Sequence, residues 1–136
     1  MTKPSVTYYE PIDSGKYSPK LVDIIINSIQ ERKGIDLVSL DLKKAEGAIC
    51  DNFIICQGGS STQVRAIADY VVEEAKNLLS TDPLSKEGFE NMQWILLDYV
   101  DVVVHIFQAE ARAYYNVEGL WADAEATYFN NEPRAV

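Results

Sequence analysis

The stretch Asn52-Phe-Ile-Ile-Cys-Gln-Gly-Gly-Ser-Ser61, with the residues up to Leu79, decides the fold of this chain. Residues 52–57 form an apolar run of β-branched and aromatic side chains, typical of a buried strand, and Gly58-Gly59 ends it. Ser60 or Ser61 can cap a following helix, because a serine hydroxyl accepts a hydrogen bond from a free N–H of the first turn. That helix has an apolar stripe of Val64, Ile67, Ala68, Val71, Val72, Ala75, Leu78 and Leu79. A strand packed beneath a helix is therefore expected.

Before this stretch the sequence predicts a helix and a strand. Ser18-Pro19 is typical of a helix start and Gly34 of a helix end, which predicts a helix over 19–33. Its buried stripe is Leu21, Val22, Ile25 and Ile29, and Ile24 and Ile26 widen the apolar arc. We expect some of that arc to contact a second molecule. The side chains of residues 35–42 alternate so that one face is mainly apolar, which predicts a short strand, and residues 43–50 are expected to form a loop.

After the helix that ends near Leu79 the pattern is more broken. Residues 80–90 are expected to form a loop. The apolar runs 93–99 and 102–107 meet around Val100-Asp101, and so short a joint permits only an antiparallel hairpin or a bulged bend. A short helix follows over 110–115, and periodicity is lost after Asp123. The order αββαββα predicts a two-layer α/β or α+β domain around a mixed sheet with flanking helices. We place this domain at 18–123, between a flexible extension (1–17) and a C-terminal tail (124–136).

Size and charge limit the classes of function. The 136 residues and 15.3 kDa fit one domain, and the net charge of −9 disfavours direct binding of DNA or RNA phosphates. Residues 87–136 hold two Lys or Arg against nine Asp or Glu. This acidic surplus, together with the aromatics Trp94, Tyr99, Tyr114, Tyr115 and Trp121, favours a protein partner with a basic face.

Several features predict a reduced, cytoplasmic protein that is not embedded in a membrane. Cys50 and Cys56 match neither a zinc spacing nor a secreted disulfide framework, and apolar packing is expected for at least Cys56. Every apolar run is too short to cross a bilayer, and residues 1–17 resemble neither a signal nor a transit peptide.

Gly58-Gly59-Ser60-Ser61 leaves two interpretations open. A strand-to-helix junction can bind phosphate through free backbone N–H groups, and Gly-Gly-Ser also resembles the opening motif of nucleotidyltransferases. Such enzymes need two carboxylates on a following strand, whereas Asp69 lies inside the predicted helix without an acidic partner two residues later. We therefore favour a turn and a helix cap, and expect neither a metal nor a cofactor.

The hairpin carries the remaining candidate residues. His105 is the single histidine and lies on the strand face of Val103 and Phe107. It has no nucleophile in a signature context, so a structural or interface histidine is favoured over a catalytic one. Asp98 and Asp101 flank the joint, where they either form a solvated turn or bind a cationic partner.

Taken together, several segments resemble the ribosomal silencing factor, or Iojap-like, family. The resemblance runs from about Leu21 to Asp123 and is carried most specifically by Trp94-Ile-Leu-Leu-Asp-Tyr-Val-Asp-Val-Val-Val-His-Ile-Phe107 and by Glu110-Ala-Arg-Ala-Tyr-Tyr-Asn-Val-Glu-Gly-Leu-Trp121. Asp36–Asp41 and Cys50–Arg65 add to it. The chain departs from the family where Asn52, Val100 and Asn116 replace a frequent Tyr, Gly and Asp.

The resemblance implies a nucleotidyltransferase-like fold without the catalytic acids, and no enzymatic activity. It also implies a homodimer that binds the fourteenth protein of the large ribosomal subunit and blocks joining of the small subunit, so that translation is repressed. We expect the partner surface at residues 94–105, with Asp98 and Asp101 facing basic groups, Trp94 and Tyr99 as apolar anchors, and His105 beside them. An active nucleotidyltransferase is the alternative.

Overall fold

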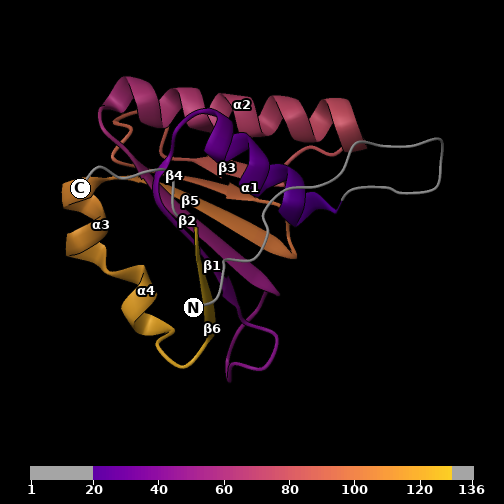
Figure 1. Cartoon of the computed structure of the whole chain (residues 1–136), viewed down its shortest axis with the longest axis vertical. Coiled ribbons are helices and arrows are strands. Elements are labelled where there is room, and N and C mark those ends of the chain that lie inside the picture. Colours follow the sequence, from indigo (N-terminus) through magenta and orange to yellow (C-terminus); the bar gives the residue numbers. More distant parts are fainter. Residues whose placement is uncertain (1–19, 130–136) are drawn as a thin grey trace.

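The computed structural model describes residues 20–129. It contains α1 (Leu21–Glu31), β1 (Ile35–Asp41), β2 (Asn52–Gly58), α2 (Ser61–Leu79), β3 (Ser85–Glu87), β4 (Trp94–Asp98), β5 (Val102–Gln108), α3 (Ala109–Tyr115), α4 (Val117–Leu120) and β6 (Glu125–Phe129). The expected extension 1–17 and the pair Ser18-Pro19 lie outside the described residues. The strands form one six-stranded sheet in the order β3-β4-β5-β2-β1-β6 (Figure 1).

The sheet is mixed, as the strand pattern predicted. β2 and β5 pair in parallel at its centre, and Ile55 faces His105 across this pair. All other neighbours are antiparallel, including the predicted hairpin of β4 and β5, in which Leu96 faces His105. This arrangement of six strands with packed helices is an α+β fold.

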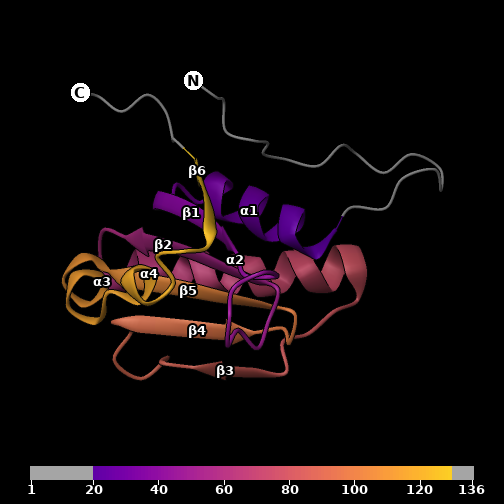
Figure 2. The same cartoon turned by 90° about the horizontal axis from the view of Figure 1, so that it is seen from below.

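Helices α1 and α2 lie together over one face of the sheet (Figures 1 and 2). The apolar stripe of α2 packs there against inward-facing strand residues such as Ile54, Ile95 and Ile106, which are fully buried. At roughly 1.5–3 kcal/mol for each large aliphatic side chain, burial of this layer is the main force that holds the helices to the sheet.

The expected junction between β2 and α2 is confirmed. Ser60 is the N-cap of α2, and its hydroxyl accepts a hydrogen bond from the Gln63 backbone N–H at 3.1 Å. A Cβ at Gly58 would lie 2.9 Å from the Val64 backbone nitrogen, so only glycine allows the strand to approach the helix this closely.

Helix α1 is shorter than expected, and the side chains of its apolar arc are buried within the molecule. It spans Leu21–Glu31 and begins after Lys20. Ile24 and Ile26 are 1% and 5% exposed, so the expectation that they contact a second molecule is wrong. The sheet and its neighbouring helix bury a wider arc than one helix flank alone would.

Three short elements differ from the expected order. β3 lies in the segment expected to be a loop, and α4 follows α3 directly. β6 lies within the expected tail and pairs with β1 from Leu37–Phe129 to Asp41–Glu125. Residues 125–129 therefore belong to the sheet rather than to a tail.

The second face of the sheet is only partly covered. Ala111 of α3 and Val117 of α4 pack on it against Val38, Leu40, Ile55 and Phe107. These contacts lie over β1, β2 and the end of β5, which leaves the β4 side and the hairpin end of this face open. Within residues 20–129, no helix combines the length and the apolar composition that a membrane crossing requires.

Candidate functional site

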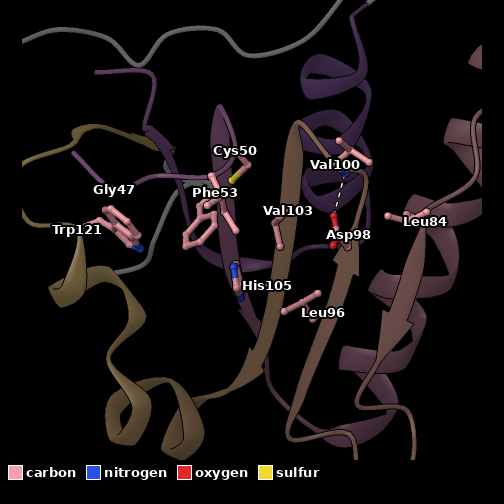
Figure 3. A pocket seen from close by; sticks show the side chains of 11 residues that line it. Gly47, Cys50, Phe53, Leu84, Leu96, Asp98, Val100, Val103, His105 and Trp121 are labelled. Atoms are coloured by element: carbon pink, nitrogen blue, oxygen red, sulfur yellow. Dashed lines mark hydrogen bonds between the residues drawn. The ribbon is translucent and has the colours of Figure 1, made fainter. Parts of the chain in front are cut away.

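The open part of the second face forms a pocket of about 490 Å³ (Figure 3). Half-buried Phe53, Leu96 and Val103 line it from the adjacent strands β2, β4 and β5. Ile49, Leu84 and Val100 also line it and are 95%, 74% and 56% exposed. The pocket thus has an apolar floor, and large apolar side chains at its rim remain in water.

His105 lies at the floor of this pocket, between Phe53 and Leu96 (Figure 3). The indole N–H of Trp94 donates to its Nδ1 at 3.1 Å. Because Nδ1 accepts, the ring proton of neutral His105 is on Nε2. Burial lowers the pKa of His105 to about 4, so the ring is neutral at pH 7. Among the described residues Nε2 has no hydrogen-bond partner, although the side chain is only 4% exposed.

Aromatic rings surround His105. Phe53 meets it edge-on at 4.5 Å between centroids, and Trp121, which follows α4, packs edge-on against Phe53 at 6.1 Å. Trp94 stacks on Phe107 and contacts Tyr115. Such ring pairs add about 0.5–1.5 kcal/mol each beyond burial, so the imidazole is held in one orientation.

Acidic residues gather at the hairpin end of the pocket. Asp98 lines the pocket, and its Oδ1 accepts a hydrogen bond from the Val100 backbone N–H at 2.8 Å. The backbone of Asp101 accepts hydrogen bonds from the N–H groups of Asp51 and Asn52. No Lys or Arg within residues 20–129 forms an ion pair with Asp51, Asp98 or Asp101. Their charges are available to a partner.

The hairpin joint itself is strained. Val100 has φ = 77°, a left-handed conformation that is a genuine outlier for a β-branched residue. Asp98 Oδ1 accepts a hydrogen bond from the Val100 N–H, and the Asp101 N–H donates to the Tyr99 carbonyl. These two hydrogen bonds hold Val100 in this conformation. The chain therefore keeps a valine side chain at the pocket rim in a backbone position that favours glycine.

The structure places Asp98 and His105 in the pocket, with Trp94 beside His105 at the end of the hairpin away from the joint and Asp101 in the joint itself. It separates Tyr99 from them. Tyr99 is 7% exposed and packs with the cluster beneath α1 and α2. Alternation explains the difference, because Tyr99 follows Ile95 and Leu97 on the helix-covered face. We had expected Tyr99 to be an apolar anchor for the partner. It is instead buried on the face opposite the pocket.

The Gly58–Ser61 junction serves the turn and the cap. The Gly59 N–H donates to Oε1 of Gln63 at 2.6 Å, and the Gln63 side-chain amide donates to the Arg32 and Lys33 carbonyls. Asp69 is exposed on α2 and is paired with Arg65 at 3.0 Å. Within residues 20–129 no group of three His, Cys, Asp or Glu side chains could hold a metal ion.

The two cysteines have different surroundings. Cys56 is fully buried as expected, and burial raises the pKa of its thiol to about 12. Cys50 lines the pocket, and desolvation, followed by repulsion from Asp51, Asp98 and Asp101, raises its pKa. A raised thiol pKa makes both poor nucleophiles.

Sequence reasoning missed the loop residues of the pocket. Ile49 and Cys50 come from one segment and Leu84 from a second that is far away in sequence. Trp121, named above only as one of several aromatic residues, joins them from a third. A large apolar side chain such as Ile49 or Leu84 in a segment expected to be a loop is the one available signal, since a loop buries little.

Comparisons with known proteins identify the family of this chain. The family model "Ribosomal silencing factor during starvation" matches residues 16–135 and so extends past Asp123, where the resemblance was expected to end. The chain is 39% identical to the ribosomal silencing factor of Halalkalibacterium halodurans, over 77% of this chain and 88% of that protein. It is 36% identical to that of Bacillus subtilis, over 76% and 86%.

A solved structure supports the same assignment. The crystal structure of a Chromobacterium violaceum protein superposes with a TM-score of 0.71 at 33% identity, covering 75% of this chain and 83% of that one. The chain therefore belongs to the ribosomal silencing factor (Iojap-like) family, whose members are non-enzymatic, ribosome-binding regulators that block the association of ribosomal subunits.

Proposed function

We propose that this chain docks on the fourteenth protein of the large ribosomal subunit through the pocket face of the β4–β5 hairpin. Trp94, Asp98, Asp101 and His105 form the contact, and Tyr99 supports the turn from the opposite face. A factor bound there occupies the intersubunit face, so the small subunit cannot join and translation is repressed.

The observation that carries this proposal is the combination of an apolar pocket with unpaired acids. The exposed rim residues Leu84 and Val100 lie beside Asp98, which has no cation partner within residues 20–129. Apolar anchors with an acidic border complement a basic protein surface, and ribosomal proteins carry such surfaces to bind RNA.

We also infer that the fold is nucleotidyltransferase-like and is reused here for binding. The junction before α2 occupies the position of the enzymes' opening motif, but Gln63 fills it from within the chain. Asp69, the nearest acid at the usual separation, is exposed and paired with Arg65. We infer that the framework of strands and helices is retained, whereas the catalytic acids that the enzymes carry at the strand ends are not.

Sedimentation with separated ribosomal subunits tests the proposal. We expect the protein to pellet with large subunits and not with small ones, and to shift assembled ribosomes toward free subunits by mass action. Pelleting with small subunits alone would overturn the proposal. Magnesium-dependent nucleotide transfer that is lost on Ser60→Ala would favour the alternative enzyme.

Charge variants test the docking face. Asp101→Lys changes an exposed residue whose side chain makes no hydrogen bond or ion pair within residues 20–129, and Asp98→Asn removes a charge while an amide oxygen can still cap Val100. Loss of a desolvated charge pair weakens binding by on the order of 2–5 kcal/mol, whereas a rim acid mainly slows association. Glu73→Lys, exposed on α2, is the matched control. Equal weakening by all three would remove the hairpin acids from the site.

We further propose that the free protein self-associates as a symmetric dimer, as the resemblance implies. Since α1 buries its apolar arc internally, we assign the dimer contact to the exposed Tyr114 and Tyr128. Light scattering should give twice the 15.3 kDa of one chain at micromolar concentration. A mass of one chain would contradict the dimer.

A further inference from the structure

We propose that the pocket binds one apolar side chain from an extended segment of a basic protein, and that a carbonyl oxygen of this segment accepts a hydrogen bond from Nε2 of His105. The inference rests on the proposed function and specifies what the partner must present at this site.

The first argument is the orientation of the histidine. The Trp94 N–H occupies Nδ1, so Nε2 is the donor atom, and it is buried without a hydrogen-bond partner among residues 20–129. Folded proteins leave few buried donors unpaired. A donor that loses its hydrogen bond to water on burial and gains no other partner lowers the stability of the folded state. His105 lines the pocket, so an acceptor that enters the pocket is the group placed to bind this N–H.

The second argument is the exposed rim. Leu84 and Val100 are 74% and 56% exposed, while Phe53, Leu96 and Val103 are half-buried. A small molecule on the floor would leave the rim side chains in water. An extended peptide covers floor and rim together, and it offers carbonyl oxygens at regular spacing along its backbone.

The third argument is charge. Asp51, Asp98 and Asp101 lie close enough to Cys50, which lines the pocket, to act on its thiol, and no ion pair within residues 20–129 neutralises them. A nucleic-acid strand would bring phosphates against these carboxylates. A segment with Lys or Arg next to its apolar anchor would instead pair with them, so the occupant is a basic peptide segment.

A matched pair of variants at His105 tests the hydrogen bond. In His105→Gln, the amide oxygen can accept from Trp94 and the amide nitrogen can donate to the partner, whereas His105→Met has a similar shape and no donor. We expect large-subunit binding to be nearly unchanged for His105→Gln and roughly tenfold weaker for His105→Met, the effect of one unpaired buried group. Circular dichroism confirms that each variant is folded.

Nuclear magnetic resonance shows directly which ring nitrogen of His105 carries the proton and whether that N–H is hydrogen-bonded. In the ¹⁵N-labelled full chain, His105 should show a protonated Nε2 and a bare Nδ1. On addition of the purified fourteenth large-subunit protein, the Nε2 proton should move downfield as it forms a stronger bond. An unchanged resonance in a saturated complex would mean that the N–H only faces the Phe53 ring, and the hydrogen bond to the partner would be refuted.

A second pair tests the apolar anchor. Leu84→Ser removes a rim side chain, and Leu120→Ser removes one of equal exposure, 75% against 74%, that does not line the pocket. We expect Leu84→Ser to bind large subunits several-fold more weakly and Leu120→Ser to bind as the natural chain does. Equal loss in both would refute the pocket as the anchor.

The outcomes separate the two proposals. If the natural chain fails to bind large subunits, the proposed function fails and this inference fails with it. If the natural chain binds while His105→Met and Leu84→Ser bind equally well, docking stands and the pocket inference alone is overturned.

Discussion

The strained hairpin joint offers a sharp test of how the site is built. At φ = 77°, Val100 holds its side chain at the pocket rim in a conformation that suits glycine. We compare Val100→Gly with Val100→Ala. Both substitutions remove the same apolar contact, but only glycine relieves the backbone.

The expected difference in stability between the two variants follows from two opposing effects. A left-handed conformation costs an L-residue about 1–2 kcal/mol, which glycine avoids. Glycine gives up about 0.5–1 kcal/mol relative to alanine, because its unfolded chain is more flexible. Val100→Gly should therefore be more stable than Val100→Ala by about 0.5–1 kcal/mol, the reverse of the order at an ordinary position.

Urea unfolding measures this order, and Val72 in the middle of α2 provides the control. There the same two substitutions should favour alanine by about 1 kcal/mol, because glycine is a poor helix former. If Val100→Ala is as stable as Val100→Gly, the left-handed joint is refuted. Large-subunit binding should weaken equally in both Val100 variants, since both lose the rim side chain, so that stability and binding change independently.

Two further predictions concern His105 and Gln63. Since the folded pKa of His105 is about 4 against 6.5 in the unfolded chain, its contribution is fully present above pH 6.5 and falls by up to roughly 3 kcal/mol as the pH drops toward 4. Urea unfolding at pH 7.5 and pH 5 should show about 2 kcal/mol of this loss for the natural chain and a smaller one for His105→Gln; equal losses would contradict a buried neutral ring. Gln63→Ala removes two hydrogen bonds that join α2 to the turn after α1 and a third to the Gly59 N–H, and should lower the free energy of unfolding by about 1–2 kcal/mol. Gln63→Glu keeps only the bond to Gly59, and its stability should lie between that of the natural chain and that of Gln63→Ala.

The elements that sequence could predict are those with an apolar pattern of their own. β2, α2 and the β4–β5 hairpin each bury a regular set of side chains, and periodicity reports burial directly. β3 and β6 are edge strands: β3 reads Ser-Lys-Glu, and only Phe129 of β6 is buried. Hydrogen bonds to distant partners define such strands, so their own sequences carry little signal.

The same distinction applies to the site. Trp94, Asp98 and His105 could be placed on one face because they share the alternation of two paired strands. The rest of the pocket depends on where the loops that carry Ile49 and Leu84 pass, and on how α4 delivers Trp121. Tertiary packing decides these positions, and local sequence does not encode them.

The location of the binding surface follows from what the fold does with its two faces and its strand ends. The helix-covered face holds the main buried core, and Gln63 fills the junction at the end of β2, where an α/β protein would ordinarily bind a ligand. What stays open is the second face, where the hairpin joint, two loops and Trp121 surround a buried donor with apolar and acidic groups. A regulator that acts by occupying space needs such a rigid surface, because its effect depends on residence at one site rather than on turnover. The strain at Val100 fits this logic, since the chain gives up stability at one backbone position to hold an apolar contact at the rim.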